Sequence, residues 1–287
     1  MKLLLHAGPM KTGSTAFQEL LSLNRSLLEQ NGIRFRHLHP RELDDLEAVL
    51  EVEQRRGWPR VLLLSHECLC RLDSHRLKAA LSLVPAPAKA VLVARPLREV
   101  YPSLYLQNLK GHVMRTSSYE EFLQEQIERD RRPQQATRGQ VFRYEFLEDQ
   151  MQAAGCAVQW VSYASSTLLG DLVGWLAHHA DAKEVLRGLK SLPPAKGISA
   201  RRSLDGTVVD VARLLNIRCR AGAVSPEDRY RLLIALLDSS DRIRSQRQGP
   251  DSFRQKQVAR LDALDDEING AFWCHQSSMH SLPWNRK

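Results

Sequence analysis

The chain has 287 residues, of which 43% are hydrophobic and 26% charged, a composition typical of a soluble globular protein that buries its own core. Its net charge of +8 indicates either an anionic partner or an arginine-rich surface. The five cysteines lack zinc-ribbon spacing, no run approaches the ~20 apolar residues of a membrane span, and the apolar start is too short for a signal peptide. We therefore expect a cytoplasmic protein without a membrane span, and leave open peripheral contact with a membrane surface.

Short apolar runs alternate with amphipathic stretches in the first part of the chain. We expect strands at 3–5, 33–35, 61–64, 90–93 and 158–161, and helices at 14–30, 43–50, 77–84, 97–109 and 168–176. Alternation of this kind predicts an α/β fold, with a parallel β-sheet flanked by helices on both faces.

Strand signals stop after Pro193-Pro194. Helices are expected at 208–215, 230–237 and 258–268, and a basic loop at 242–256. We predict a single domain over residues 1–287, with an α/β core at 1–178 and a mostly helical C-terminal part at 190–287.

A glycine-rich loop joins the first expected strand to the first expected helix, with the sequence Gly8-Pro9-Met10-Lys11-Thr12-Gly13-Ser14-Thr15. Such a turn lets backbone N–H groups point into a concavity, and the helix N-terminus adds partial positive charge. The loop therefore predicts a site for a phosphate-like anion. It differs from a Walker A loop because Ser14 stands where that motif has its lysine, and Lys11 precedes the second glycine.

A second phosphate-binding pattern follows the expected strand at 90–93. Arg95 comes directly after that strand, and Ser103 stands eight residues later in the next helix. The planar guanidinium of arginine is suited to phosphate, and the serine hydroxyl supplies a further donor.

Together these two segments resemble PAPS-dependent sulfotransferases, where PAPS is 3'-phosphoadenosine 5'-phosphosulfate. Lys-Thr-Gly-Ser-Thr is similar to the family's 5'-phosphosulfate loop, and Arg95 with Ser103 to its 3'-phosphate site. His6-Ala-Gly8-Pro and Gln18 resemble a bacterial branch. The similarity is specific to about residue 110 and looser to about residue 178.

The resemblance implies a P-loop NTPase-like sulfotransferase fold, with residues 1–178 as the nucleotide-binding core. It implies transfer of a sulfuryl group from PAPS to a hydroxyl of a glycan, lipid or small metabolite, with release of PAP and no metal. The implied nucleotide-binding residues are Gly8, Lys11, Thr12, Gly13, Ser14, Thr15, Arg95 and Ser103.

The resemblance also indicates catalytic residues. Lys11 is expected to neutralise the leaving-group oxygens. A general base is expected after a central strand, where this chain has Ser65-His66-Glu67. Glu67 is favoured because the bacterial branch has Ser-Ser-Glu there, and His66 stays open because soluble eukaryotic members use histidine. A non-catalytic alternative is that Glu67 caps the following turn.

The C-terminal third departs from the family pattern, because it has no clear Arg-Lys-Gly-x-x-Gly-x-x-Lys segment. The basic residues Arg244, Arg247 and Arg254 with Gly249 either replace it or form a solvated loop. Two other functions remain open, a nucleotide kinase with a rearranged loop and a nucleic-acid-binding protein. The second is disfavoured because no nucleic-acid-binding motif is present. The sequence predicts neither the acceptor nor the oligomeric state.

Overall fold

The computed structural model describes residues 1–10, 14–111, 113–135, 141–163, 167–189, 204–246 and 258–278. The chain divides into two compact units. Unit 1 comprises Met1–Arg95, Ala136–Leu192 and Asn269–Lys287, and unit 2 comprises Pro96–Gln135 and Pro193–Ile268. In this division, residues 96–135 group with the C-terminal helices. The expected single domain, with parts at 1–178 and 190–287, stays a prediction.

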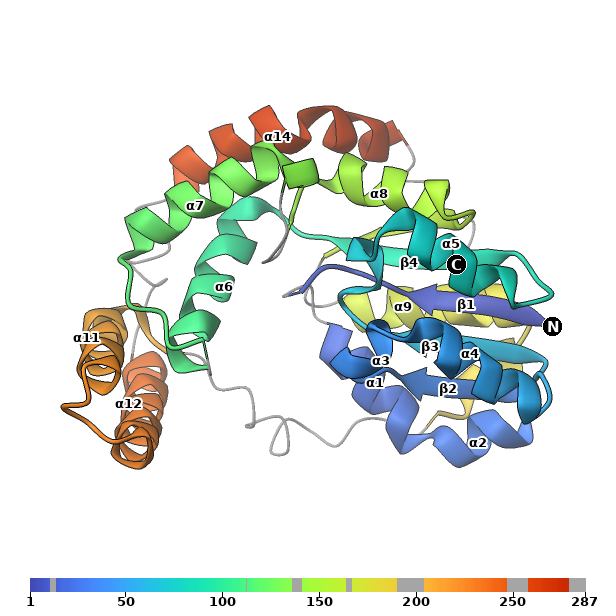
Figure 1. Cartoon of the computed structure of the whole chain (residues 1–287), viewed down its shortest axis with the longest axis horizontal. Helices are drawn as coiled ribbons and strands as arrows, with labels where there is room; N and C mark the ends of the chain where they lie inside the picture. The colour runs from blue at the N-terminus through green and yellow to red at the C-terminus, as the bar shows by residue number, and fades with distance from the viewer. Residues whose placement is uncertain are drawn as a thin grey trace. The chain divides into compact units, whose positions relative to one another are not determined.

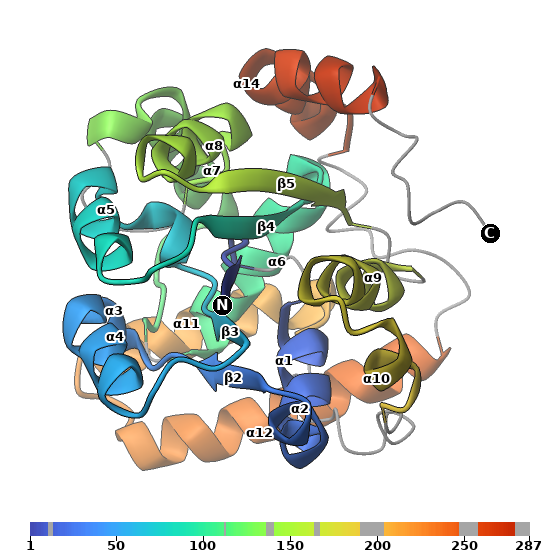
Figure 2. The same cartoon turned by 90° about the vertical axis from the view of Figure 1, so that its right-hand side faces the viewer.

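Unit 1 is built on a five-stranded sheet in which every neighbouring pair is parallel, in the order β2-β3-β1-β4-β5 (Figures 1 and 2). The strands are β1 (Lys2–His6), β2 (Ile33–His37), β3 (Val61–Ser65), β4 (Ala88–Ala94) and β5 (Ala157–Ser162). All five expected strands are present, which confirms the predicted α/β class. The first strand of the chain, β1, lies at the centre between β3 and β4.

Helices cover both faces of this sheet (Figure 2). One face carries α1 (Ser14–Leu23), α2 (Arg25–Gln30), α9 (Leu168–Ala180) and α10 (Lys183–Arg187), and the other carries α3 (Pro40–Leu43), α4 (Leu46–Arg55), α5 (Ser74–Ser82) and α8 (Tyr144–Ala153). A short 3-10 turn, η1 (Leu69–Arg71), follows β3. The helix expected at 97–109 is present, but it belongs to unit 2.

Two expected helices are each divided in the structure. The helix expected over residues 14–30 is interrupted at Asn24, whose side-chain amide donates to the Leu20 carbonyl at 2.8 Å. Asn competes with the helical backbone through such local bonds, which explains the interruption. Around residue 45, Asp45 accepts a hydrogen bond from the Ala48 N–H and caps α4, so α3 and α4 are separate helices.

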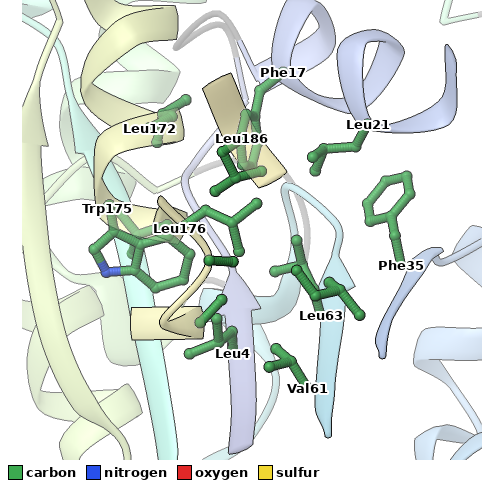
Figure 3. Packing of buried hydrophobic residues seen from close by; sticks show 14 of the residues in the cluster. Leu4, Phe17, Leu21, Phe35, Val61, Leu63, Leu172, Trp175, Leu176 and Leu186 are labelled. Atoms are coloured by element: carbon green, nitrogen blue, oxygen red, sulfur yellow. The ribbon is translucent and has the colours of Figure 1, made fainter. Parts of the chain in front are cut away.

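One part of the core of unit 1 lies between the sheet and the layer formed by α1 and α9. Leu4, Leu63 and Phe35 come from three strands and belong to one buried cluster with Phe17 of α1 and Trp175 of α9 (Figure 3). All five side chains are almost fully buried. Burial of residues of this size contributes roughly 1.5–3 kcal/mol each, so this layer fixes α1 against the sheet.

The C-terminal end of α14 (Val258–Ser278) also belongs to unit 1, where it contacts the start of α8. Asn269 accepts a hydrogen bond from the Tyr144 N–H and donates one to the Phe142 carbonyl, both at 3.0 Å. The Phe272 ring packs against Tyr144 and Trp160. A residue near the end of the chain is therefore bonded to the segment that leads into α8.

All the secondary-structure elements of unit 2 within the described residues are helices. The unit contains α6 (Leu97–Lys110), α7 (Tyr119–Arg131), η2 (Pro133–Gln135), η4 (Gly206–Val208), α11 (Val209–Arg220), α12 (Pro226–Gln246) and the first half of α14. The buried Asn216 and Arg229 both donate to the Leu109 carbonyl at the end of α6. The mostly helical character expected for the C-terminal part is confirmed over the described residues.

The prediction of a basic loop at 242–256 is wrong for residues 242–246, because α12 continues to Gln246. The reason is that no helix-breaking residue occurs before Gly249. Arg244 therefore lies in a helix, whereas Arg247, Gly249 and Arg254 fall outside the described residues. Within the described ranges, no helix is both long and apolar enough to cross a membrane.

Candidate active site

The expected phosphate loop begins where the central strand β1 ends. Gly8 follows β1, and Ser14 is the first residue of α1. Ser14 is 1% exposed and Thr15 is partly exposed. The first turn of a helix has backbone N–H groups without acceptors within the helix, and these attract anions. Lys11, Thr12 and Gly13 lie outside the described residues.

Arg95 follows β4, the strand next to β1. Its guanidinium lies over the ring of Tyr163, 4.1 Å from the ring centroid. Its backbone N–H donates to the Tyr144 hydroxyl at 3.1 Å, and that hydroxyl donates in turn to the Arg95 carbonyl. A guanidinium stacked in this way keeps its N–H donors directed outward in its own plane, which suits a phosphate.

Ser103, the other residue expected at the 3'-phosphate, lies in α6 and is partly exposed. It belongs to unit 2, whereas Arg95 is the last residue of the first segment of unit 1. The joint role of Arg95 and Ser103 therefore stays a prediction.

The two candidate bases follow β3, the strand on the other side of β1. His66 and Glu67 are both partly exposed. The Cys68 N–H donates to Nδ1 of His66 at 2.9 Å, so His66 caps this turn. Burial, and secondly the nearby His37 and His39, lower the pKa of His66 to about 4.

These observations limit what His66 can do. A neutral histidine whose Nδ1 accepts a hydrogen bond carries its proton on Nε2. Neither nitrogen then has a lone pair available for a substrate proton. A carboxylate has no such restriction, because it accepts hydrogen bonds at both oxygens. The choice of Glu67 over His66 as the proton acceptor stays a prediction.

Sequence reasoning named His6, Gln18 and Ser65 within motifs but missed the contacts between them, and it missed Tyr163. His6, Ser65 and Gln18 are buried and hydrogen-bonded to one another. Burial, and secondly His37, lower the pKa of His6 to about 3. Tyr163 could be noticed as an aromatic residue just after the last expected strand. Its contact with Arg95 could not be predicted, because the two residues are 68 positions apart (163 minus 95).

Among the residues that the structure describes, no three His, Cys, Asp or Glu side chains are grouped so as to hold a metal ion. That the reaction needs no metal stays a prediction.

No family model matches the sequence, and no curated protein matches it. Several solved structures are similar to the chain. Mouse sulfotransferase SULT7A1 complexed with PAP has 11% identity and a TM-score of 0.45, and the match covers 98% of this chain and 89% of that one. Retinol dehydratase in complex with androsterone and the inactive cofactor PAP has 16% identity and a TM-score of 0.36, with coverage of 94% and 81%.

A de novo designed protein with a P-loop NTPase fold is also similar, at 15% identity and a TM-score of 0.26. That match covers 62% of this chain and 97% of the designed one. At such low identities and scores, evidence for the function has to come from the residues of this chain.

Proposed function

We propose that this protein is a sulfotransferase that moves a sulfuryl group from PAPS to an acceptor hydroxyl. The observation that carries the proposal is the order of three neighbouring strands. The segments that contain Glu67, the phosphate loop and Arg95 follow β3, β1 and β4, which are adjacent and parallel. Their carboxyl ends meet at one edge of the sheet, where ligands bind in open α/β folds.

The residues at this edge fit the two anionic ends of PAPS. The buried Ser14 and the first turn of α1 would hold the 5'-phosphosulfate. Arg95, supported by the Tyr163 ring, would hold the 3'-phosphate, and Ser103 of α6 is proposed to assist it. PAPS supplies an activated sulfuryl group when it is bound; the remaining tasks belong to the protein.

Those tasks are orientation, charge stabilisation and acceptance of one proton. A bond forms between the acceptor oxygen and sulfur, while the bond between sulfur and the phosphate oxygen breaks and its electron pair leaves with PAP. The acceptor proton passes to the carboxylate of Glu67. Lys11 is proposed to neutralise the charge that develops on the leaving phosphate.

A thermal-shift comparison of PAP, AMP and ATP tests the nucleotide assignment. A ligand at 100 times its dissociation constant stabilises the folded state by about 2.7 kcal/mol. We expect the largest stabilisation with PAP. Equal stabilisation by PAP and AMP contradicts a 3'-phosphate site, and a clear preference for ATP indicates the alternative function, a nucleotide kinase.

The acceptor requires a separate experiment. Incubation with PAPS and a metabolite extract, followed by mass spectrometry, reveals acceptors by the gain of one sulfuryl group. Glycans, lipids and small alcohols all carry a suitable hydroxyl. The cytoplasmic location and the absence of a nucleic-acid partner stay predictions from the sequence.

A further inference from the structure

Three buried polar side chains contact one another at the edge of the sheet where the phosphate loop begins. Nδ1 of His6 lies 2.8 Å from Oγ of Ser65, and Nε2 of Gln18 donates to the same Oγ at 3.0 Å. His6 and Ser65 are 0% exposed and Gln18 is 5% exposed. We call these three residues the polar brace.

Ser65 is the centre of the brace, because both hydrogen bonds end at its hydroxyl oxygen. A hydroxyl can accept two hydrogen bonds and donate one, so Ser65 accepts from Gln18 and either donates to Nδ1 of His6 or accepts from it, according to the tautomer of the ring. Among the described residues, the other ring nitrogen of His6, the buried Nε2, has no hydrogen-bond partner. Burial keeps the ring neutral, since it lowers the pKa of His6 to about 3.

The brace joins the elements that surround the candidate site. His6 is the last residue of β1, which enters the phosphate loop, and Gln18 lies in α1, which leaves it. Ser65 is the last residue of β3, directly before His66 and Glu67. The His66 N–H also donates to the His6 carbonyl at 3.1 Å, which extends the pairing of β1 with β3 by one residue.

The layer directly below the brace has a different chemistry. Leu4 and Leu63 precede His6 and Ser65 by two positions, so they point to the same face of the sheet, and both belong to the apolar core. Apolar packing is not directional, whereas hydrogen bonds between buried groups specify one arrangement. The change from leucine to polar residues occurs at the level where the chain turns into the loop.

We propose that His6, Gln18 and Ser65 are positioning residues, which hold the flanks of the phosphate loop at a fixed distance from the segment that carries Glu67. The inference rests on the proposed sulfotransferase function. Loss of the brace should misplace the base relative to the bound donor while the loop itself still binds nucleotide. Turnover should therefore fall much more than affinity for PAP.

The test uses Ser65→Ala and Gln18→Met, with Leu21→Ala as the matched control. Leu21 also lies on α1 and is fully buried, but it packs in the apolar core (Figure 3). PAP formation from PAPS is measured with water or glycerol as acceptor, together with PAP affinity and melting temperature. Misplacement by about 1 Å costs up to about a hundredfold, so we expect Ser65→Ala to lose about 10- to 100-fold in turnover per folded molecule.

The double variant provides a sharper criterion. If Ser65 and Gln18 act through one brace, Ser65→Ala/Gln18→Met should be no slower than Ser65→Ala alone, within about twofold. PAP affinity should stay within about threefold of the native protein in all variants, and Leu21→Ala should lower the melting temperature only. Turnover of Ser65→Ala equal to that of Leu21→Ala, or two effects that multiply, overturns the proposal.

A second measurement is independent of enzymatic activity. Nitrogen-15 NMR of the histidine rings should show a change in the His6 Nδ1 signal in Ser65→Ala, because that variant removes the hydrogen-bond partner of Nδ1. Amide exchange of the His66 N–H should be at least about tenfold faster in Ser65→Ala and unchanged in Leu21→Ala. If the native protein neither binds PAP nor consumes PAPS, the proposed function fails, and these two signals still decide whether the brace holds the Glu67 segment. An unchanged His6 Nδ1 signal, or unchanged His66 exchange, overturns the brace.

Discussion

Acidification should destabilise the native protein through His6 in particular. The native ring is fully buried, and its pKa is lowered from 6.5 to about 3. The unfolded chain therefore takes up this proton first as the pH falls. Stability from the neutral ring is fully present above about pH 6.5 and is lost progressively between about pH 6.5 and pH 3.

The size of the effect follows from the shift. One pKa unit corresponds to about 1.36 kcal/mol. A pH of about 5 lies about 1.5 units below the pKa of the unfolded imidazole, which is therefore mostly protonated. The folded ring is still neutral at this pH. The free energy of unfolding should therefore drop by about 2 kcal/mol between about pH 7.5 and pH 5 because of His6 alone.

The assay is urea unfolding followed by tryptophan fluorescence over this pH range, for the native protein and His6→Gln. Glutamine does not titrate and provides an amide that can form a hydrogen bond with Ser65. The native protein should lose about 2 kcal/mol more than His6→Gln. His66 and His179, which also have lowered pKa values, are present in both proteins and cancel.

His75→Gln is the control, because it removes an imidazole from a side chain that is 95% exposed. It should retain the native pH dependence. Parallel stability curves for the native protein and His6→Gln would refute the reasoning, because they would mean that His6 takes up a proton without cost in the folded state.

The proposed chemistry leads to three further expectations. Lys11→Ala should lower turnover at least about tenfold with little change in PAP affinity, because a contact made mainly in the transition state acts on turnover; normal turnover of the folded variant removes Lys11 from the mechanism. Arg95→Ala should erase most of the preference for PAP over AMP, a loss of about 1.5–3 kcal/mol measured by calorimetry, and an unchanged preference contradicts the 3'-phosphate assignment. Glu67→Gln should lose at least about a hundredfold in turnover at saturating PAPS, and His66→Asn less. The reverse result identifies His66 as the base.

The strands of the sheet were predictable because their sequences are unambiguous. Val61–Ser65 and Ala88–Ala94 consist largely of consecutive apolar residues, as expected for strands buried on both faces. The order of the strands was not predictable, since it depends on contacts between distant segments. That β1 lies between β3 and β4 is what brings three separately predicted segments to adjacent positions.

The polar brace illustrates the same limit. His6 and Ser65 face each other only because β1 and β3 pair in a particular register, and the two residues are 59 positions apart. In the sequence, each is a single polar residue at the end of an apolar run. Likewise, no local pattern indicated that His66 rather than Glu67 accepts the Cys68 N–H, because that choice depends on side-chain rotamers.

The contacts of Asn269 have a consequence for truncated forms of this protein. Asn269 holds the start of α8, and the Tyr144 hydroxyl in that helix is bonded to both backbone groups of Arg95. Unit 1 is thus completed by a residue 174 positions after Arg95 (269 minus 95). A fragment ending at residue 178 retains all five strands and Tyr144 but lacks the Asn269 side chain that holds the start of α8, so a stable fragment of unit 1 should include the end of α14.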